Sequence, residues 1–316
     1  MMLTLKDDIT FDRDLPLRTS LCKIMHQPAH FHENAIEIIL VLKGAVNIRS
    51  SHRHITLYKG DIFSMDPGDI HCIYSDVDNI VLHLHLNTES DLYPRERIYN
   101  CFFACETQYV QSYQWEAFHK VKDLILAGAL EYMMTDMAPS RPVIKSIADL
   151  LLRTLIKHFD WLSFIWDPTD SNPIMQERFH RIISYCQENY KEKISISMLA
   201  EKEHFNENYF SALMRKTSFE GFSNMLNFFR CDGAERLLLT TDKSVIEISD
   251  MCGFSDPKYF YKHFKKWWDS SPAKLRRWYR DYSLSDDETD VLTPGQSTDV
   301  LKDYLAEYHI YRSSGM

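Results

Sequence analysis

The sequence lacks three features, and each absence excludes a class of protein. It contains no run of about 18 apolar residues, so it has no candidate transmembrane helix. The amino terminus has no basic-then-apolar pattern of a secretory signal. The seven cysteines are odd in number and include no Cys-x-x-Cys pair, which argues against a disulfide framework or a zinc module. We therefore expect a cytoplasmic protein with reduced thiols and no membrane partner.

The composition is that of a globular protein, but the charge is unevenly distributed. The 316 residues are 45% apolar and 26% charged, and the chain is long enough for two domains. The net charge is -9, yet residues 174–282 hold 18 basic and 15 acidic residues, a net +3. The remaining residues carry a net charge of -12. The overall negative charge weakens non-specific attraction to DNA. Contacts to the bases must therefore carry more of the discrimination between specific and non-specific sites.

Residues 244–280 have the clearest pattern in the chain, that of two short helices around a tight turn. Val245, Ile248 and Met251 recur every three residues and give the first helix an apolar face. Gly253 suits the turn, because a backbone at positive φ is easiest without a Cβ atom.

The second helix of this pair has a start signal, an apolar face and a basic face. Ser255 or Asp256 is placed to cap it, and Pro257 suits its first turn. Phe260 and Phe264, four residues apart, face inward. A run of charged residues usually marks only a solvent-exposed surface. Here the turn, the cap and the aromatic stripe together indicate a helix–turn–helix, whose second helix fits a DNA major groove. Between residues 258 and 280 one acidic residue stands against eight basic ones: Lys258, Lys262, Lys265, Lys266, Lys274, Arg276, Arg277 and Arg280.

This stretch resembles the C-terminal signature of AraC/XylS-type bacterial transcription regulators. The run CGFSDPKYFYKHFKKWW, followed by SPAKLRR, is similar to that family's Gly-Phe-Ser, Tyr-Phe, Phe-Lys-Lys and Ser-Pro pattern. Asp269 stands where the family usually has glycine, and Leu275 where an aromatic is common. The resemblance implies specific binding of promoter double-stranded DNA by a homodimer, with RNA polymerase as a further partner of an activator.

A weaker helix–turn–helix pattern precedes this one, over Ile196–Lys216. Asn206 is its expected cap, and His204 replaces the glycine of the turn, because histidine tolerates positive φ better than most residues. An amphipathic helix over Met175–Asn189 comes before it, and a long helix over Phe222–Leu239 joins the two units.

Gly233 lies in the middle of that connecting helix, where glycine costs about 1 kcal/mol relative to alanine, so we expect a loosened connection. Two such units contact successive major grooves about 10 bp apart. Matched position by position, the resemblance implies base contacts from Asn208, Ser211, Ala212, Lys258, Tyr261 and Lys262. It implies phosphate contacts from Lys265, Arg276 and Arg277.

The N-terminal half changes to short β-type runs after an arm over residues 1–20. Turn residues punctuate these runs, and many short strands at regular spacing indicate a sandwich or barrel. The predicted strands are Ile36–Leu42, Ala45–Arg49, His54–Tyr58, Asp61–Met65 and Ile80–Leu86.

Histidines and one glutamate occur in this half at a recognisable spacing. His30, His32, Glu37 and Gly44 give HxH-x4-E-x6-G, and a Pro-Gly-Asp-Ile-His run ends at His71. This resembles the paired motifs of the cupin barrel, the usual effector domain of AraC-type regulators. In cupin enzymes the matching residues bind a divalent metal, and three imidazoles with a carboxylate suit Fe, Mn, Ni or Zn.

The rival interpretation of these residues, which we favour, is a pocket for a small organic effector, with no metal and no cofactor. His83 and His85 lie on one side of a predicted strand, opposite its leucines. Alternation alone leaves open whether that side faces the barrel lumen or solvent. The predicted effector-binding residues are His30, His32, Glu37, His71, His83 and His85.

Two further regions complete the chain. Residues 112–166 show helical spacing in two runs broken near Met137–Pro142, and such helices cover a barrel or, in this family, typically form a dimer interface. The tail from Ser283 begins with acidic and turn-forming residues typical of a disordered spacer, followed by a short helix over Thr298–Ile310.

The sequence thus predicts a multidomain protein. An all-β cupin-like barrel with two appended helices spans residues 1–166, a linker 167–173, an all-α double helix–turn–helix domain 174–282 and an acidic tail 283–316. We expect a non-enzymatic transcription regulator that responds to a small molecule such as a sugar. The resemblance implies an activator, because activation is more usual than repression in this family. The alternatives are a metal-binding cupin enzyme or metal sensor with a DNA-binding module, and a regulator whose input is pH or a partner protein.

Overall fold

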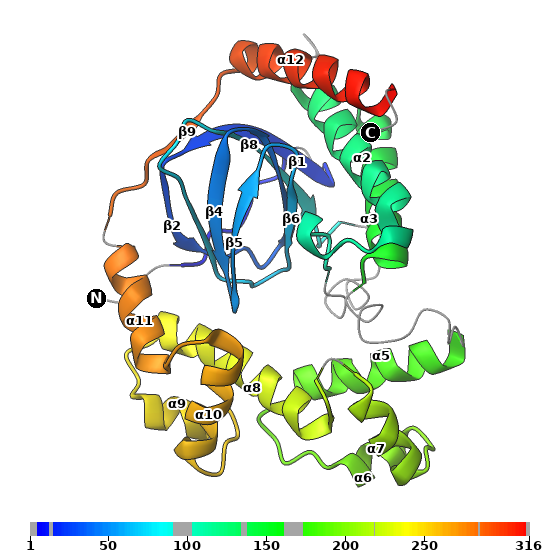
Figure 1. Cartoon of the computed structure of the whole chain (residues 1–316), viewed down its shortest axis with the longest axis vertical. Helices are drawn as coiled ribbons and strands as arrows, with labels where there is room; N and C mark the ends of the chain where they lie inside the picture. Colours follow the sequence, from blue (N-terminus) through cyan, green and yellow to red (C-terminus); the bar gives the residue numbers. More distant parts are fainter. Residues whose placement is uncertain are drawn as a thin grey trace. The chain divides into compact units, whose positions relative to one another are not determined.

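The computed structural model describes residues 5–12, 15–90, 103–133, 138–160, 173–217, 219–283 and 285–313. The chain forms two compact units, which we describe separately (Figure 1). A β-rich unit takes most of the first 160 residues and also the segment from Ser285 onward. A helical unit takes most of the chain between them, residues 161–284. The predicted linker lies outside the described residues up to Pro173, which begins a helix.

The β-rich unit is built from two antiparallel sheets. The first has five strands in the order β6-β3-β8-β1-β9, and the second has four in the order β2-β7-β4-β5. The strands are β1 (Leu17–Ile24), β2 (His26–His30), β3 (Ala35–Lys43), β4 (Ala45–Ser50), β5 (Arg53–Tyr58), β6 (Ile62–Met65), β7 (His71–Tyr74), β8 (Ile80–Asn87) and β9 (Thr289–Val291). The five predicted strands are β3, β4, β5, β6 and β8, whereas β1, β2, β7 and β9 were not predicted.

Strand β3 explains how one sheet carries two cores. Its residues are buried from Ala35 to Leu42, which accounts for the nearly continuous apolar run in the sequence. Ile38 and Leu40 belong to an outer core shared with the helices, and Ile39 and Val41 belong to an inner core between the sheets. Side chains that alternate along a strand are thereby divided between two packed layers.

Two helices, α2 (Trp115–Met133) and α3 (Arg141–His158), pack against each other and against the five-stranded sheet. Short 3-10 turns over Thr107–Tyr109 and Ser112–Gln114 lead into them. On β8, Leu82, Leu84 and Leu86 join the outer core with these helices. Side chains alternate along a strand, so His83 and His85 point to the opposite face, between the two sheets. The structure therefore shows that His83 and His85 face the interior of the barrel, which the alternation in the sequence left open.

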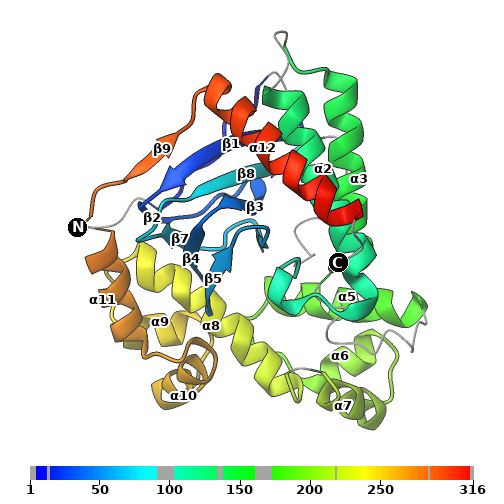
Figure 2. The ribbon, with the colours of Figure 1, turned by 45° about the horizontal axis from the view of Figure 1, so that its top comes forward.

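The C-terminal tail returns to the β-rich unit and completes it. β9 pairs with the edge strand β1, with Cys22 opposite Val291. Helix α12 (Pro294–Ser313) packs beside α2 (Figure 2) and adds three buried side chains to the outer core: Leu301, Tyr304 and Tyr308. The prediction of a disordered spacer was wrong, because backbone pairing with β1 orders the stretch that acidic composition marked as solvated.

Side chains around α12 fix its position. The Tyr308 hydroxyl donates to Asp123 Oδ1 at 3.0 Å, and Lys59 forms an ion pair with Glu307. Nearby, the buried Lys122 donates its ammonium to the Gly60 carbonyl at 2.6 Å and lies 5.7 Å from the centre of the Tyr308 ring. The helix is thus held by specific polar contacts as well as by its apolar side.

The helical unit contains two helix–turn–helix pairs joined by a long helix. Its helices are α5 (Pro173–Glu188), α6 (Ile196–Lys202), α7 (Glu207–Arg215), α8 (Phe222–Thr240), α9 (Val245–Met251), α10 (Pro257–Trp268) and α11 (Pro272–Tyr282). The predicted caps are confirmed: Asn206 accepts from the Tyr209 backbone N–H, and Asp256 from that of Lys258. The turns place His204 at φ 55° and Gly253 at φ 81°, as their positions predicted.

Gly233 does not interrupt the connecting helix, contrary to the expected loosening. Helix α8 runs unbroken from Phe222 to Thr240. A Cβ atom at Gly233 would lie 2.2 Å from the Tyr190 hydroxyl oxygen, so only glycine lets the tyrosine ring pack against the helix. Arg230, one turn earlier, donates to the Tyr190 carbonyl at 2.9 Å. The glycine therefore permits a close contact that strengthens this region.

Candidate ligand site and DNA-reading surface

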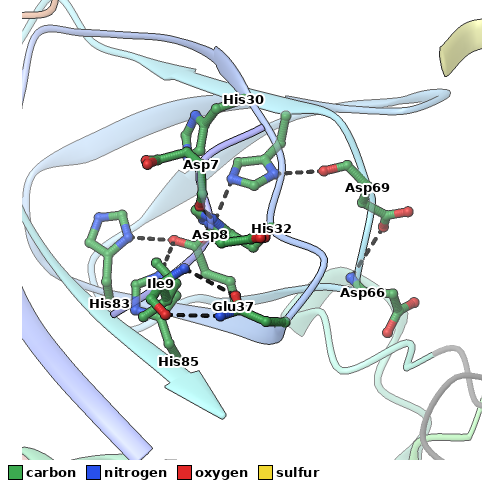
Figure 3. A network of polar contacts seen from close by, with 12 residues as sticks. Asp7, Asp8, Ile9, His30, His32, Glu37, Asp66, Asp69, His83 and His85 are labelled. Atoms are coloured by element: carbon green, nitrogen blue, oxygen red, sulfur yellow. Dashed lines mark hydrogen bonds and ion pairs between the residues drawn. The ribbon is translucent and has the colours of Figure 1, made fainter. Parts of the chain in front are cut away.

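Glu37 lies at the centre of the candidate ligand site. It projects from β3, is 2% exposed, and is surrounded by five histidines from three other parts of the barrel (Figure 3). Pairing of β2 with β7 places His30 opposite His71, and pairing of β3 with β8 places Glu37 opposite His85. All six predicted effector-binding residues therefore come together: His30, His32, Glu37, His71, His83 and His85.

One oxygen of Glu37 faces two of the histidines, and a third, His30, lies beside them. Its Oε2 lies 3.2 Å from His32 Nε2 and 3.0 Å from His71 Nε2. One ligand atom from each of His30, His32, His71 and Glu37 lies within 4.8 Å of the other three. A tetrahedral ion with ligands at about 2.0–2.1 Å separates its ligand atoms by roughly 3.3 Å, so the site already has nearly the dimensions of a metal centre.

The backbone fixes the tautomer of these three histidines. His30 Nδ1 lies 2.9 Å from the Pro28 carbonyl, His71 Nδ1 lies 2.9 Å from the Asp69 carbonyl, and His32 Nδ1 contacts the Asp7 carbonyl. A carbonyl only accepts, so each Nδ1 must carry a proton, and each neutral ring has its lone pair on Nε2. Metal-binding histidines are oriented in the same way, by a hydrogen bond from the nitrogen that does not bind the ion.

The opposite oxygen of Glu37 faces the two histidines of β8. Its Oε1 lies 2.6 Å from His83 Nδ1 and 3.6 Å from His85 Nε2. The two rings are nearly parallel, with an interplanar angle of 17° and centroids 6.2 Å apart. Glu37 thus uses each oxygen toward a different set of histidines.

The electrostatics of the cluster favour a cation. Burial alone would raise the pKa of Glu37, but the charges of His85 and His71 outweigh it and hold the pKa well below its usual range. Burial and the neighbouring His71 hold the pKa of His30 well below its usual range. Burial acts to lower the pKa of His32, but the hydrogen bond and charge of Glu37 raise it overall. An ionised carboxylate among imidazoles is an attractive site for positive charge.

Residues 5–12 of the N-terminal arm pack beside this site, a position that the sequence did not predict. Asp7 donates its backbone N–H to the Phe31 carbonyl at 2.9 Å, and Asn34 bonds the backbone of Ile9 through both its amide atoms. These contacts bring the Asp7 carbonyl to His32. The arm meets the histidine cluster through a backbone carbonyl, that of Asp7, which no sequence motif signals.

The proposed recognition helices present their predicted side chains to solvent. On α10, Phe260, Phe264 and Trp268 are buried, so the opposite face is free. The predicted base-contacting residues exposed on these helices are Asn208, Ala212, Lys258, Tyr261 and Lys262, and Ser211 is half-buried. Two exposed tyrosines that were not among the predicted contacts, Tyr209 and Tyr259, occupy the same position after the cap of each helix and are 50% and 54% exposed.

The predicted phosphate-contacting residues differ in their surroundings. Lys265 and Arg277 are exposed. Arg276 is half-buried, and its Nε donates to the Leu238 carbonyl at the end of α8 at 2.8 Å. Burial lowers the pKa of its guanidinium. The structure therefore uses Arg276 to join α11 to α8, and a phosphate would have to share it with that contact.

Comparisons with known proteins match each unit to a family. Residues 19–112 match the model of the AraC-like ligand-binding domain, and residues 199–277 match a helix-turn-helix domain. Within the described residues, no helix is both long and apolar enough to cross a membrane.

Named relatives are transcription regulators. The chain is 32% identical over 139 residues to the uncharacterised HTH-type transcriptional regulator YijO of Escherichia coli K12. It is 30% identical over 134 residues to RafR, the raffinose operon transcriptional regulatory protein of Pediococcus pentosaceus. These matches cover 44% and 42% of the chain, and the chain spans about half (48%) of the length of each relative. The solved DNA-binding domain of AdpA with its target DNA is 28% identical, covering 37% of this chain and all of that domain, with a TM-score of 0.32.

Proposed function

We propose that the chain is an AraC-type transcription regulator, because it joins an AraC-like ligand-binding domain to a helix-turn-helix domain, and that its ligand is a metal ion. In this proposal residues 174–282 bind a promoter, and the barrel changes that binding when an ion occupies the histidine cluster. A homodimer that contacts RNA polymerase as an activator is the form we propose for the working protein.

One observation carries the metal proposal, which replaces our sequence-based preference for a site without metal. Backbone carbonyls hold Nδ1 of His30, His32 and His71 protonated, so each neutral ring has its lone pair on Nε2, and the Nε2 atoms of His32 and His71 lie 3.2 and 3.0 Å from the buried Glu37 Oε2. A positive species must lie between them, either extra protons on the rings or one ion. The His30 and His71 ring centroids are only 4.2 Å apart, so several imidazolium charges would repel in a buried site. A single ion satisfies all the lone pairs at once.

The chemistry of the ligand set indicates the class of ion. Imidazole suits zinc, copper, nickel and iron, whereas magnesium and calcium prefer sites made of oxygen ligands. A set of three histidines and one glutamate therefore favours a late first-row transition metal. We propose a regulatory role for this ion, and a catalytic one is disfavoured because the named relatives are regulators.

A sugar is the second candidate ligand. It is the class we expected from family usage, and one relative is named for the raffinose operon. The same histidines would then serve as hydrogen-bond partners of hydroxyl groups.

A thermal-shift series on the full chain separates the two ligands. The full chain is required because α12 contributes to the core of the β-rich unit. Ligand at 100 times its Kd stabilises the folded form by about 2.7 kcal/mol and raises the Tm. We expect Zn²⁺ or Co²⁺ to raise the Tm, with reversal by a chelator and a parallel change in promoter affinity. A shift with sugars that is indifferent to chelator would contradict the metal proposal and establish the second candidate.

The DNA-reading role is tested at Lys262 on the exposed face of α10. A lysine there can donate to guanine O6 and N7, so Lys262→Ala should weaken binding to the cognate promoter by about 1–3 kcal/mol and relax the base preference at one position. Lys243→Ala, which removes the same charge from the exposed segment between α8 and α9, is the matched control. Equal weakening of Lys262→Ala on random DNA would show that Lys262 contacts only phosphate.

A further inference from the structure

The two oxygens of Glu37 divide the cluster into two sets of ligand atoms that share only this residue. One set joins His30 with His32 and His71, which face Oε2. The other is His83 and His85 beside Oε1 (Figure 3). The second set also meets the geometric requirement for an ion, since ligand atoms of Glu37, His83 and His85 lie within 4.8 Å of one another. The sequence resemblance to the cupin motifs covers only the first set.

The second set is built on the most regular part of the fold. β3 and β8 pair in register from Ala35 to Val41, with Glu37 opposite His85 and Ile39 opposite His83. Both histidines therefore project from a central strand onto the same face as Glu37, where sheet hydrogen bonds fix their Cα positions. Ligands on rigid strands hold a metal with more precise geometry than ligands on loops.

The tautomers of His83 and His85 are not fixed by other contacts. Their remaining nitrogens, His83 Nε2 and His85 Nδ1, are buried and have no hydrogen-bond partner among the residues that the structure describes. Either ring can therefore carry its proton on the remote nitrogen and direct a lone pair at an ion beside Oε1 without breaking another hydrogen bond. His30, His32 and His71 differ, because backbone carbonyls already determine their tautomer.

We propose that the barrel holds two late first-row metal ions bridged by Glu37, the second one bound by Oε1, His83 and His85. This inference rests on the metal-binding function proposed above. Carboxylate-bridged ions in proteins lie about 3.5–4 Å apart, which one glutamate can span with its two oxygens. The second ion takes the place of the proton between His83 Nδ1 and Oε1, and that proton moves to His83 Nε2 as the neutral ring changes tautomer, so binding widens this 2.6 Å contact.

Charge explains why the second ion should bind more weakly. Histidines bind a metal as neutral imidazoles, so the liganded cluster holds five of these and one carboxylate, and a first divalent ion already leaves a net positive charge in a buried site. The second ion enters against that charge and with three protein ligands instead of four. We expect two separable steps in a titration, the weaker one coming from His83 and His85.

The test is the number of ions bound per full-length chain. Metal-free protein is titrated with Zn²⁺ and measured by native mass spectrometry, and with Co²⁺, whose optical and magnetic signals distinguish an isolated ion from a bridged pair. We expect two ions in the wild type and one in the His83→Ala/His85→Ala variant, with the coupling signal lost. His54→Ala, an exposed histidine on β5, is the control and should keep two.

The possible results separate this inference from the function it rests on. One ion in the wild type and one in the double variant would overturn the second site and leave the metal-regulator proposal standing. No ion in the wild type would overturn both. Two ions in the double variant would place the second ion elsewhere and contradict the assignment. The wild-type stoichiometry decides the question even if the double variant fails to fold.

Discussion

Leu301→Ala should lower the free energy of unfolding of the β-rich unit by about 2–4 kcal/mol, although the residue lies in a C-terminal tail far from the barrel strands in sequence. Its side chain is fully buried in the outer core, where α12 packs beside α2. Truncating it removes apolar burial and leaves a cavity among well-packed neighbours. A domain is stable by only about 5–15 kcal/mol, so the loss is a large share.

Urea denaturation followed by fluorescence measures this change. Lys302→Ala, at the next position of α12 and exposed, is the matched control and should change stability by less than about 0.5 kcal/mol. If Leu301→Ala is as stable as the control, α12 does not belong to the core, and the tail would be the dispensable spacer that its composition suggested.

Glu37→Gln should weaken metal binding at least about 100-fold, since even changes to groups that only orient a metal ligand cost 10–100-fold. The change keeps the shape of the side chain and removes the carboxylate that both groups of ligand atoms share. An amide oxygen is a weaker ligand and carries no charge to offset that of the ion. The free energy lost corresponds to about 2.7 kcal/mol or more.

Competition with a coloured chelator measures the affinity, and the loss of metal-dependent DNA binding is the functional readout. Glu33→Gln, the same chemical change at an exposed position four residues earlier, should bind metal like the wild type. Unchanged affinity in Glu37→Gln would remove the metal proposal. Circular dichroism on each protein checks that the variant is folded before titration.

The helices and turns of the helical unit could be predicted from the sequence because the residues that begin and end them act locally. Asn206, Asp256 and Gly253 act within a few residues of themselves, through a cap or a positive φ, so spacing alone predicts them. Gly233 was misjudged because its partner, Tyr190, is distant in sequence, and a helix propensity takes no account of it. Arg276 was placed by position in a motif, which does not show that the Leu238 carbonyl lies within its reach.

The barrel shows where local patterns end. Short β-type runs predicted β3 and β8, yet the face on which His83 and His85 lie followed only from the pairing of those strands. The meeting of Glu37 with five histidines was predicted as a set by motif and alternation, but their tautomers depend on the carbonyls of Pro28, Asp7 and Asp69. A backbone carbonyl is the same in every residue, so a sequence motif cannot predict which one will accept a hydrogen bond from a histidine.

The place of α12 in the outer core has a consequence for synthesis of the protein. Leu301, Tyr304 and Tyr308 are translated after the helical unit, so the ribosome must add residues 161–284 before the barrel can close its core. At about 5–20 residues per second this takes on the order of 6–25 s. Throughout that interval the nascent barrel keeps an uncovered apolar face and an unpaired edge at β1. The helical unit, whose helices are contiguous in the chain, can fold first, so folding does not follow the order of the two units along the chain.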